Sequence, residues 1–157
     1  HLPQSRIEVL IPDFQGNRDA LRLVLESRPD VINHNLEVVR RLFGELRPGG
    51  DYRLSLEILR LVKESGYGIR SKSGFMVGFG ENMSDINMLI DDLALVGCDV
   101  LTIGQYLQPS RHHWPVEKYY SPEEFEDLRQ MALRKGFKSV QSGPLVRSSY
   151  HAEKCLG

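Results

Sequence analysis

Glycines recur within one short apolar segment, Gly74-Phe75-Met76-Val77-Gly78-Phe79-Gly80-Glu81. Because glycine has no Cβ, the backbone beside it can approach another group closely, and the flat edge of a ligand could fit there. The same glycines could instead serve a turn at the end of a strand. The segment alone leaves both interpretations open.

A second polar stretch, Asn33-His34-Asn35-Leu36-Glu37, offers two amides, an imidazole and a carboxylate where a predicted strand passes into a predicted helix. This set could cradle a ribose and an amino-acid head group. Alternatively, Asn35 could cap the helix and Glu37 could favour the helix dipole. Composition does not decide between a binding site and a helix cap.

A dense polar loop, residues 104–113, follows another predicted strand and contains the neighbouring His112 and His113. Adjacent histidines without a third ligand at helical spacing do not define a metal site, so surface or substrate-contacting roles are favoured. Arg111 could clamp a carboxylate or phosphate, or pair with a surface acid.

The last polar cluster, residues 143–152, contains the pair Leu145-Val146, which we expect to dock the tail on the core. Ser148 and Ser149 follow. Neighbouring side chains of an extended backbone point to opposite sides, so at most one of these serines can face a given site.

The sequence has two cysteines, Cys98 and Cys155. They are too few for a zinc quartet or an iron–sulfur triplet, and free thiols are favoured over a disulfide between them.

These polar groups need a scaffold, and the apolar periodicity predicts five βα-type units. Ser121-Pro122-Glu123-Glu124 should open the last helix, with a hydroxyl cap and Glu124 at the third helical position. We therefore predict an α/β fold with parallel strands and outer helices, either an open sheet or part of a barrel. Predicted strands cover residues 7–11, 31–32, 73–79, 100–103 and 137–140, and predicted helical stripes run from near Asn17 and over 36–46, 54–62, 86–93 and 121–132.

In such folds the chemistry lies at the carboxyl ends of the strands. Each polar group there could singly be turn chemistry. Together they favour a functional rim. The rim consists of Asp13, residues 33–35, 78–81, 105–108 and 142–143.

The 157 residues are 41% hydrophobic and 26% charged, with a net charge of −1. This composition suits one globular core and predicts neither a nucleic-acid partner nor a membrane span, since basic tracts and long apolar runs are absent from the sequence. The chain begins with His in the middle of apparent structure, so we expect an upstream portion to be missing.

The phrases EVLIPDF, VINHNLE, KSGFMVGFGE, LTIGQYLQPSRHH, SPEEF and GPLVRSSYHAE resemble lipoyl synthases in order and spacing over essentially the whole chain. Residues 74–81 resemble the GxIxGxxE motif of radical S-adenosylmethionine enzymes, with Met76 in the Ile position. RSSYHA and GQYLQPSRHH are the most specific phrases, because other enzymes of that superfamily share only the GxIxGxxE-like element.

The resemblance implies a partial (βα) barrel of the radical S-adenosylmethionine type. Residues 1–157 would be its carboxy-terminal portion, with 142–157 as a cluster-facing tail, and the amino-terminal cluster-binding part would be missing. It also implies insertion of two sulfur atoms at C6 and C8 of a protein-bound octanoyl-lysine. Two [4Fe–4S] clusters and S-adenosylmethionine would serve that reaction, one cluster cleaving S-adenosylmethionine and the other supplying sulfur.

The implied partners are an octanoylated lipoyl carrier domain or protein and an electron donor such as ferredoxin or flavodoxin. The implied compartment is the cytoplasm in a bacterium, and the mitochondrial matrix or plastid in a eukaryote.

The resemblance also assigns roles to individual residues. Ser149, or alternatively Ser148, would be a ligand of the sulfur-donating cluster, held by Arg147 and Tyr150. Arg111 and His112 would face the substrate or cofactor. The expected contacts of S-adenosylmethionine are Asn33, Glu37, Gly78, Glu81 and Gln105.

This sequence departs from the family in lacking both cysteine triplets, so we expect the isolated chain to be inactive. One alternative is a non-catalytic βα scaffold or binding module. Another is a sulfur inserter similar to biotin synthase, which would not account for the RSSYHA tail.

Overall fold

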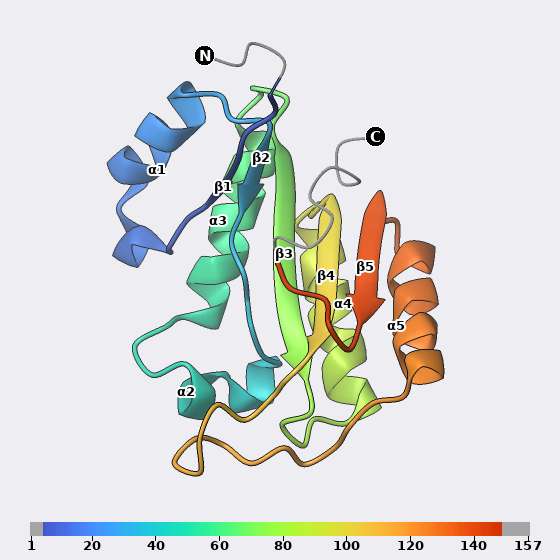
Figure 1. The fold of residues 1–157 in the computed structure, drawn as a ribbon. Coiled ribbons are helices and arrows are strands. Elements are labelled where there is room, and N and C mark those ends of the chain that lie inside the picture. The colour runs from blue at the N-terminus through green and yellow to red at the C-terminus, as the bar shows by residue number, and fades with distance from the viewer. Residues whose placement is uncertain (1–4, 149–157) are drawn as a thin grey trace.

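The computed structural model describes residues 5–148, and its five strands form a single parallel sheet. The strands follow one another across the sheet in chain order (Figure 1). This confirms the predicted α/β class, and a parallel sheet wound in sequence order is the arrangement of a partial βα barrel. The strands are β1 (Glu8–Leu10), β2 (Val31–Asn33), β3 (Arg70–Val77), β4 (Val100–Gln105) and β5 (Ser139–Gly143).

Helices connect the strands, and α3 and α4 cover the rear face of the sheet in Figure 1. The predicted cap of the last helix is confirmed: Ser121 Oγ accepts from Glu124 N, and the Glu124 carboxylate accepts from Ser121 N. The helices are α1 (Arg18–Glu26), α2 (Phe43–Leu46), α3 (Tyr52–Glu64), α4 (Met83–Leu95) and α5 (Pro122–Arg134), with short 3-10 turns η1 (Phe14–Gly16) and η2 (Arg40–Leu42).

The two faces of the sheet differ in chemistry because side chains alternate along each strand. On the outer face, Phe75, Leu101 and Val140 belong to the main core. On the opposite face, which we call the inner face, the strands carry mostly polar residues and glycines in register, together with Met76 and Val100. Among its residues are Asn33, Lys72, Gly74, Met76, Val100, Thr102, Gly104, Ser139, Gln141 and Gly143.

The predicted helical stripe over 36–46 is wrong in its first part. Residues 34–37 instead follow β3: Glu37 N donates to Gly74 O at 2.9 Å, and Glu37 O accepts from Met76 N at 2.8 Å. His34 N donates to Lys72 O. The step from His34 to Glu37 is therefore paired with the shorter step from Lys72 to Gly74, and this extra residue on one strand defines a β-bulge. Asn35 caps no helix within the described residues: its Oδ1 has no hydrogen-bond partner there, and its carbonyl accepts from Arg47 Nη1 at 2.8 Å.

Asp99, just before β4, is buried at the amino end of the sheet and binds two lysines. Its Oδ1 lies 2.8 Å from the Nζ atoms of both Lys63 and Lys138, and its Oδ2 accepts from Ser71 N at 3.1 Å. Burial by itself raises the pKa of Asp99, but the two lysines and the Ser71 amide together lower it by more than burial raises it. The net pKa of Asp99 therefore lies below its usual value.

A depressed folded-state pKa contributes stability above the unfolded pKa, and that contribution is lost as the pH falls through the folded pKa. We expect Asp99→Asn to lower the free energy of unfolding at pH 7 by about 2 kcal/mol, since both lysines are partly solvated. The loss should shrink below about pH 4. Urea unfolding of the purified protein at several pH values, with exposed Asp127→Asn as control, measures this. An equal loss at pH 3 and pH 7 would contradict it.

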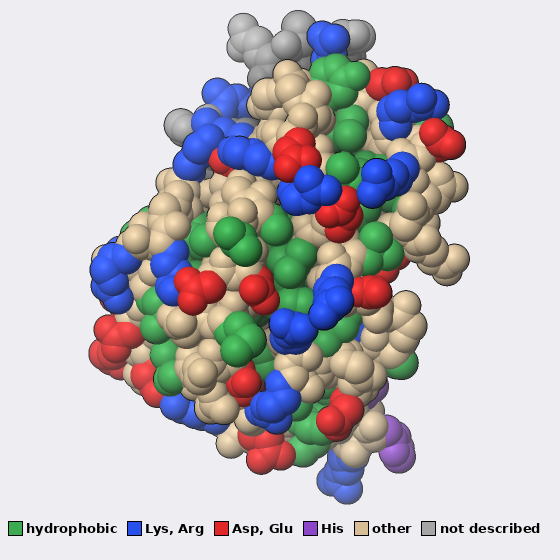
Figure 2. Space-filling view, turned by 180° about the vertical axis from the view of Figure 1, so that it is seen from behind, with side chains coloured by type: hydrophobic (Ala, Val, Ile, Leu, Met, Phe, Trp, Pro, Cys, Tyr) green, Lys and Arg blue, Asp and Glu red, His purple; other side chains and the backbone are tan. Residues whose placement is uncertain are grey.

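The face covered by helices carries positive and negative side chains interspersed with one another (Figure 2). Among the described residues, the helices are too short or too polar for any of them to cross a bilayer.

Candidate functional site

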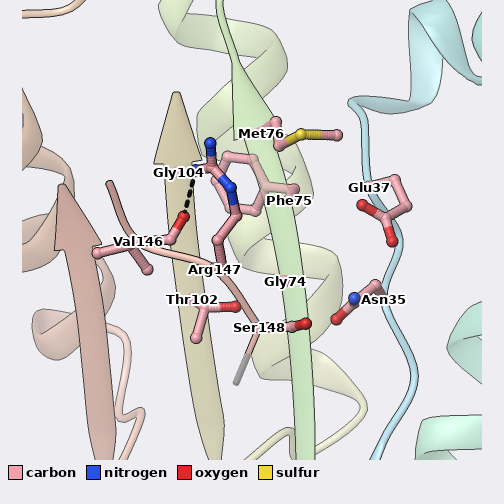
Figure 3. Close-up of a pocket in the computed structure, with 10 residues that line it drawn as sticks. All are labelled: Asn35, Glu37, Gly74, Phe75, Met76, Thr102, Gly104, Val146, Arg147 and Ser148. Carbon is pink, nitrogen blue, oxygen red and sulfur yellow. Dashed lines mark hydrogen bonds between the residues drawn. The ribbon is translucent and has the colours of Figure 1, made fainter. Parts of the chain in front are cut away.

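A cavity of about 130 Å³ opens on the inner face, between the segment after β2 and the tail after β5 (Figure 3). In Figure 1 the tail turns back from β5 across β4, on the side away from α3 and α4. The predicted site residues Glu37, Arg147 and Ser148 meet here. The remaining lining residues are Asn35, Gly74, Phe75, Met76, Thr102, Gly104 and Val146.

Two glycines make the cavity's close contacts possible. A Cβ on Gly74 would lie 2.3 Å from Thr102 Oγ1 and 3.1 Å from Asn35 Oδ1. A Cβ on Gly104 would lie 2.4 Å from the carbonyl oxygen of Val146. The backbone at Gly74 does approach other groups closely, but these groups are the side chains of Thr102 and Asn35, so a ligand contact of this segment stays a prediction. Sequence reasoning missed the close approach at Gly104.

The tail is seated on the sheet by Val146. This side chain is buried, its N–H donates to Gly143 O at 3.1 Å, and its carbonyl accepts from Arg147 Nη1 at 2.7 Å. Leu145 is 77% exposed, so the expected docking of the apolar pair is wrong for that residue. Ser148 lines the cavity opposite Asn35 (Figure 3).

Two of the predicted tail residues, Ser149 and Tyr150, lie outside the described residues, as does Cys155.

Residues 33–35 each carry a buried polar atom that has no hydrogen-bond partner within the described structure: Asn33 Oδ1, His34 Nε2 and Asn35 Oδ1. Burial lowers the pKa of His34, so its ring is neutral at pH 7. Its Nδ1 lies 2.9 Å from Ile11 O, which requires the proton on Nδ1 and leaves Nε2 as an acceptor. All three atoms are acceptors, so only a hydrogen-bond donor could satisfy them.

Glu37 adds a carboxylate to the same wall. Its backbone φ is +70°, a left-handed conformation that costs a residue with a Cβ about 1 kcal/mol. This conformation belongs to the bulge and places Glu37 beside Asn35 at the cavity (Figure 3). Residues 35 and 37 of the predicted cradle thus lie on the cavity wall, and their contact with a ligand stays a prediction.

The predicted site residues Gly78 and Glu81 form a closed loop after β3. The buried Glu81 carboxylate accepts from Gly78 N at 2.8 Å, Phe79 N at 2.9 Å and the Tyr120 hydroxyl at 3.0 Å. Burial and the Glu81 charge raise the pKa of Tyr120, which therefore keeps its proton to donate. Glu81 and Gly78 hold this loop in place, and their contact with a cofactor stays a prediction.

Gln105, at the end of β4, is likewise engaged by its own chain. Its Nε2 donates to Val77 O at 3.2 Å and Lys118 O at 3.0 Å, and its Oε1 accepts from Tyr120 N at 3.0 Å. The side chain joins β3, β4 and the loop that leads to α5. Its predicted cofactor contact also stays a prediction.

The exposed Arg111 and His112 lie in the loop between β4 and α5 and do not line the cavity. The loop is braced by Ser110 Oγ, which lies 2.9 Å from His113 Nδ1, and by Gln108 Nε2, which donates to His113 O at 2.9 Å. The predicted substrate-facing roles of Arg111 and His112 stay predictions.

An iron–sulfur cluster does not fit the described residues. Within residues 5–148, three His, Cys, Asp or Glu side chains do not come together as a ligand set. Cys98 is buried in the outer core, and burial raises the pKa of its thiol to about 12, which disfavours the thiolate that iron requires. Any cluster ligands must therefore come largely from elsewhere.

Comparison with known proteins gives matches over nearly the whole chain. The family model of the Radical SAM superfamily matches residues 1–93. A lipoyl synthase of Thioalkalivibrio sulfidiphilus is 52% identical over 155 residues, which cover 98% of this chain and 48% of that protein. A lipoyl synthase of Bacteroides fragilis is 50% identical over 97% of this chain and 52% of its own length, and one of Symbiobacterium thermophilum is 52% identical over 97% and 48%. The chain thus spans about half the length of the curated relatives it matches.

Proposed function

The chain belongs to the Radical SAM superfamily, and on that premise we propose that the whole protein is a lipoyl synthase. It would insert two sulfur atoms at C6 and C8 of an octanoyl group carried on a protein lysine. The observation that carries this proposal is the convergence of Ser148 from the tail with Asn35 and Glu37 on one cavity.

The cavity suits part of S-adenosylmethionine. When bound, this cofactor supplies the carbon radical that removes hydrogen from the substrate. The unpartnered oxygen of Asn35 on the cavity wall, and that of Asn33 one row below it on the inner face, would accept from ribose hydroxyls or the ammonium group. Glu37, on the cavity wall, would favour the positive charge of the cofactor.

The tail would bring a hydroxyl to the sulfur-donating cluster. We keep Ser149 as the proposed ligand and Ser148 as its alternative, with Arg147 and Tyr150 holding the segment. An alkoxide or hydroxyl oxygen binds iron less firmly than thiolate does, which suits a ligand that leaves as sulfur is given up. The cysteines for two [4Fe–4S] clusters would lie upstream.

The proposed partners are an octanoylated carrier domain and a ferredoxin or flavodoxin as electron donor. Arg111 and His112, exposed at the carboxyl ends of the strands, are the proposed contacts of the substrate or cofactor. If the source is bacterial, the proposed compartment is the cytoplasm.

The test is an anaerobic reaction of the reconstituted full-length protein with an octanoylated carrier domain, S-adenosylmethionine and a reductant. Mass spectrometry should show two sulfur atoms replacing two hydrogens. Dethiobiotin is the comparison substrate, and Ser148→Ala and Ser149→Ala identify which hydroxyl matters. Conversion of dethiobiotin alone, or no S-adenosylmethionine cleavage at all, would overturn the proposal.

Replacing Glu37 by glycine should weaken cofactor binding without destabilising the fold. In the full-length protein, Glu37→Gly should weaken S-adenosylmethionine binding about tenfold or more, because a charge-assisted contact is lost. The same change relieves the φ of +70°, so the free energy of unfolding should stay constant or rise by up to about 1 kcal/mol.

Equilibrium dialysis and urea unfolding measure the two effects. Glu37→Gln is the control: it keeps the strained backbone and removes only the charge, so it should weaken binding without stabilising the fold. A Glu37→Gly protein that binds S-adenosylmethionine normally would show that the carboxylate does not contact it.

A further inference from the structure

A buried ion pair lies on the inner face beneath the cavity. Lys72 Nζ sits 2.9 Å from both carboxylate oxygens of Glu8, with the lysine side chain 0% and the glutamate side chain 18% exposed. Lys72 is two residues before Gly74 on the same face of β3, one row below the cavity wall. Withdrawing such a pair from water is costly and seldom stabilises a fold more than apolar residues would, so its geometry calls for an explanation.

The amide of Asn33 also hydrogen-bonds to this ion pair. Asn33 and Lys72 are direct partners across β2 and β3, so their side chains share the inner face. Asn33 Nδ2 donates to Glu8 Oε1 at 3.3 Å, while its Oδ1 is one of the unpartnered acceptors. The flipped amide would set Oδ1 against the carboxylate oxygen, and two acceptors repel each other.

Glu8 therefore favours one of the two orientations of the Asn33 amide. Lys72 in turn holds Glu8 in place by hydrogen-bonding to both of its carboxylate oxygens. Asn33 pairs with Lys72, two residues before Gly74 on β3, so it lies on the inner face one row below the cavity wall and is not itself one of the lining residues. Its unpartnered Oδ1 is an acceptor on the same face as the Asn35 oxygen at the cavity.

We propose that Glu8 and Lys72 are positioning residues, which hold the Asn33 amide with its oxygen toward the cofactor so that it accepts from a hydroxyl or ammonium group. This inference rests on the proposed function, since it takes S-adenosylmethionine as the ligand. The two residues act through Asn33 and make no contact with the ligand themselves.

The test is a double-mutant cycle on S-adenosylmethionine binding, measured by equilibrium dialysis with the full-length protein. Glu8→Gln alone strands a buried lysine charge and can fail to fold, so the main variant is Glu8→Gln with Lys72→Met, which removes both charges at similar volume. This double variant should bind about tenfold more weakly, as is usual when a supporting residue is lost. In an Asn33→Ala background the same two changes should cause no further loss.

Glu126→Gln is the matched control, because it breaks an exposed ion pair on α5 and should leave binding unchanged. A loss of equal size with and without the Asn33 side chain would overturn the positioning role, since a general structural defect does not depend on Asn33. Unchanged binding in the double variant would overturn it as well. Failure of the unmutated protein to bind S-adenosylmethionine would instead overturn the proposed function, and this inference with it.

Discussion

Replacing Gly104 by alanine should lower the sulfur-insertion activity of the full-length protein about 100-fold while leaving it folded. The added methyl group would lie 2.4 Å from the carbonyl oxygen of Val146, and this is backbone, which cannot rotate away as a side chain can. The tail must therefore lift from β4 and carry Arg147 and Ser148 with it. A displacement of about 1 Å in a positioned group is enough for a loss of this size.

Gly143 provides the matched control, because it is the direct partner of Gly104 across β4 and β5. A Cβ there would meet only the Val146 Cγ2 methyl at 3.4 Å, an ordinary contact. We expect Gly143→Ala to keep activity within about threefold of the unmutated protein. Product formation and the melting temperature should be measured together. Near-normal activity of Gly104→Ala, or equal losses in both variants, would show that the reaction does not depend on how closely the tail packs on β4.

Much of the scaffold could be predicted from the sequence because each element carries its own local signal. The predicted β-branched strands correspond to β1, β2 and β4. Ser121 and Glu124 form the predicted capping box. The boundaries shifted where tertiary pairing decided them. Strand β3 begins at Arg70 rather than residue 73, since the extended backbone pairs with β2 before the apolar run starts.

The stripe from Leu36 shows where periodicity fails. Leu36 and Val39 are buried at helical spacing, yet the backbone between them is a bulge held by β3. Burial alone produced the pattern, and hydrogen bonding to a partner some forty residues away decided the conformation. The same bulge turns Asn35 from a predicted helix cap into a lining residue of the cavity.

The roles of Glu81 and Gln105 were beyond sequence reasoning for a different reason. Both bind Tyr120, which lies 39 residues after Glu81 and within an irregular loop. Residue type and rim position are visible in a sequence. Whether a polar side chain faces a ligand or its own chain depends on that distant loop.

That loop makes Gly78 the second position where one methyl group should have a large effect. Its φ is +118°, in a region that other residues rarely adopt, and a Cβ would lie 2.4 Å from Gln105 Nε2 and 2.9 Å from Lys118 O. We expect Gly78→Ala to lower the free energy of unfolding by about 3 kcal/mol, the sum of backbone strain and overpacking. The change should also weaken the two hydrogen bonds that Gly78 N and Phe79 N donate to the Glu81 carboxylate.

Gly80→Ala separates the two causes. Gly80 also has a positive φ, +93°, but a Cβ there would meet only the flexible Glu117 Cγ at 3.4 Å. It should therefore lose about 1 kcal/mol, from backbone strain alone. Urea unfolding of the two variants measures the difference, which isolates the clash with Gln105 and Lys118. Equal losses would mean that the loop moves aside at little cost, and the network around Gln105 would then not fix the carboxyl end of β3.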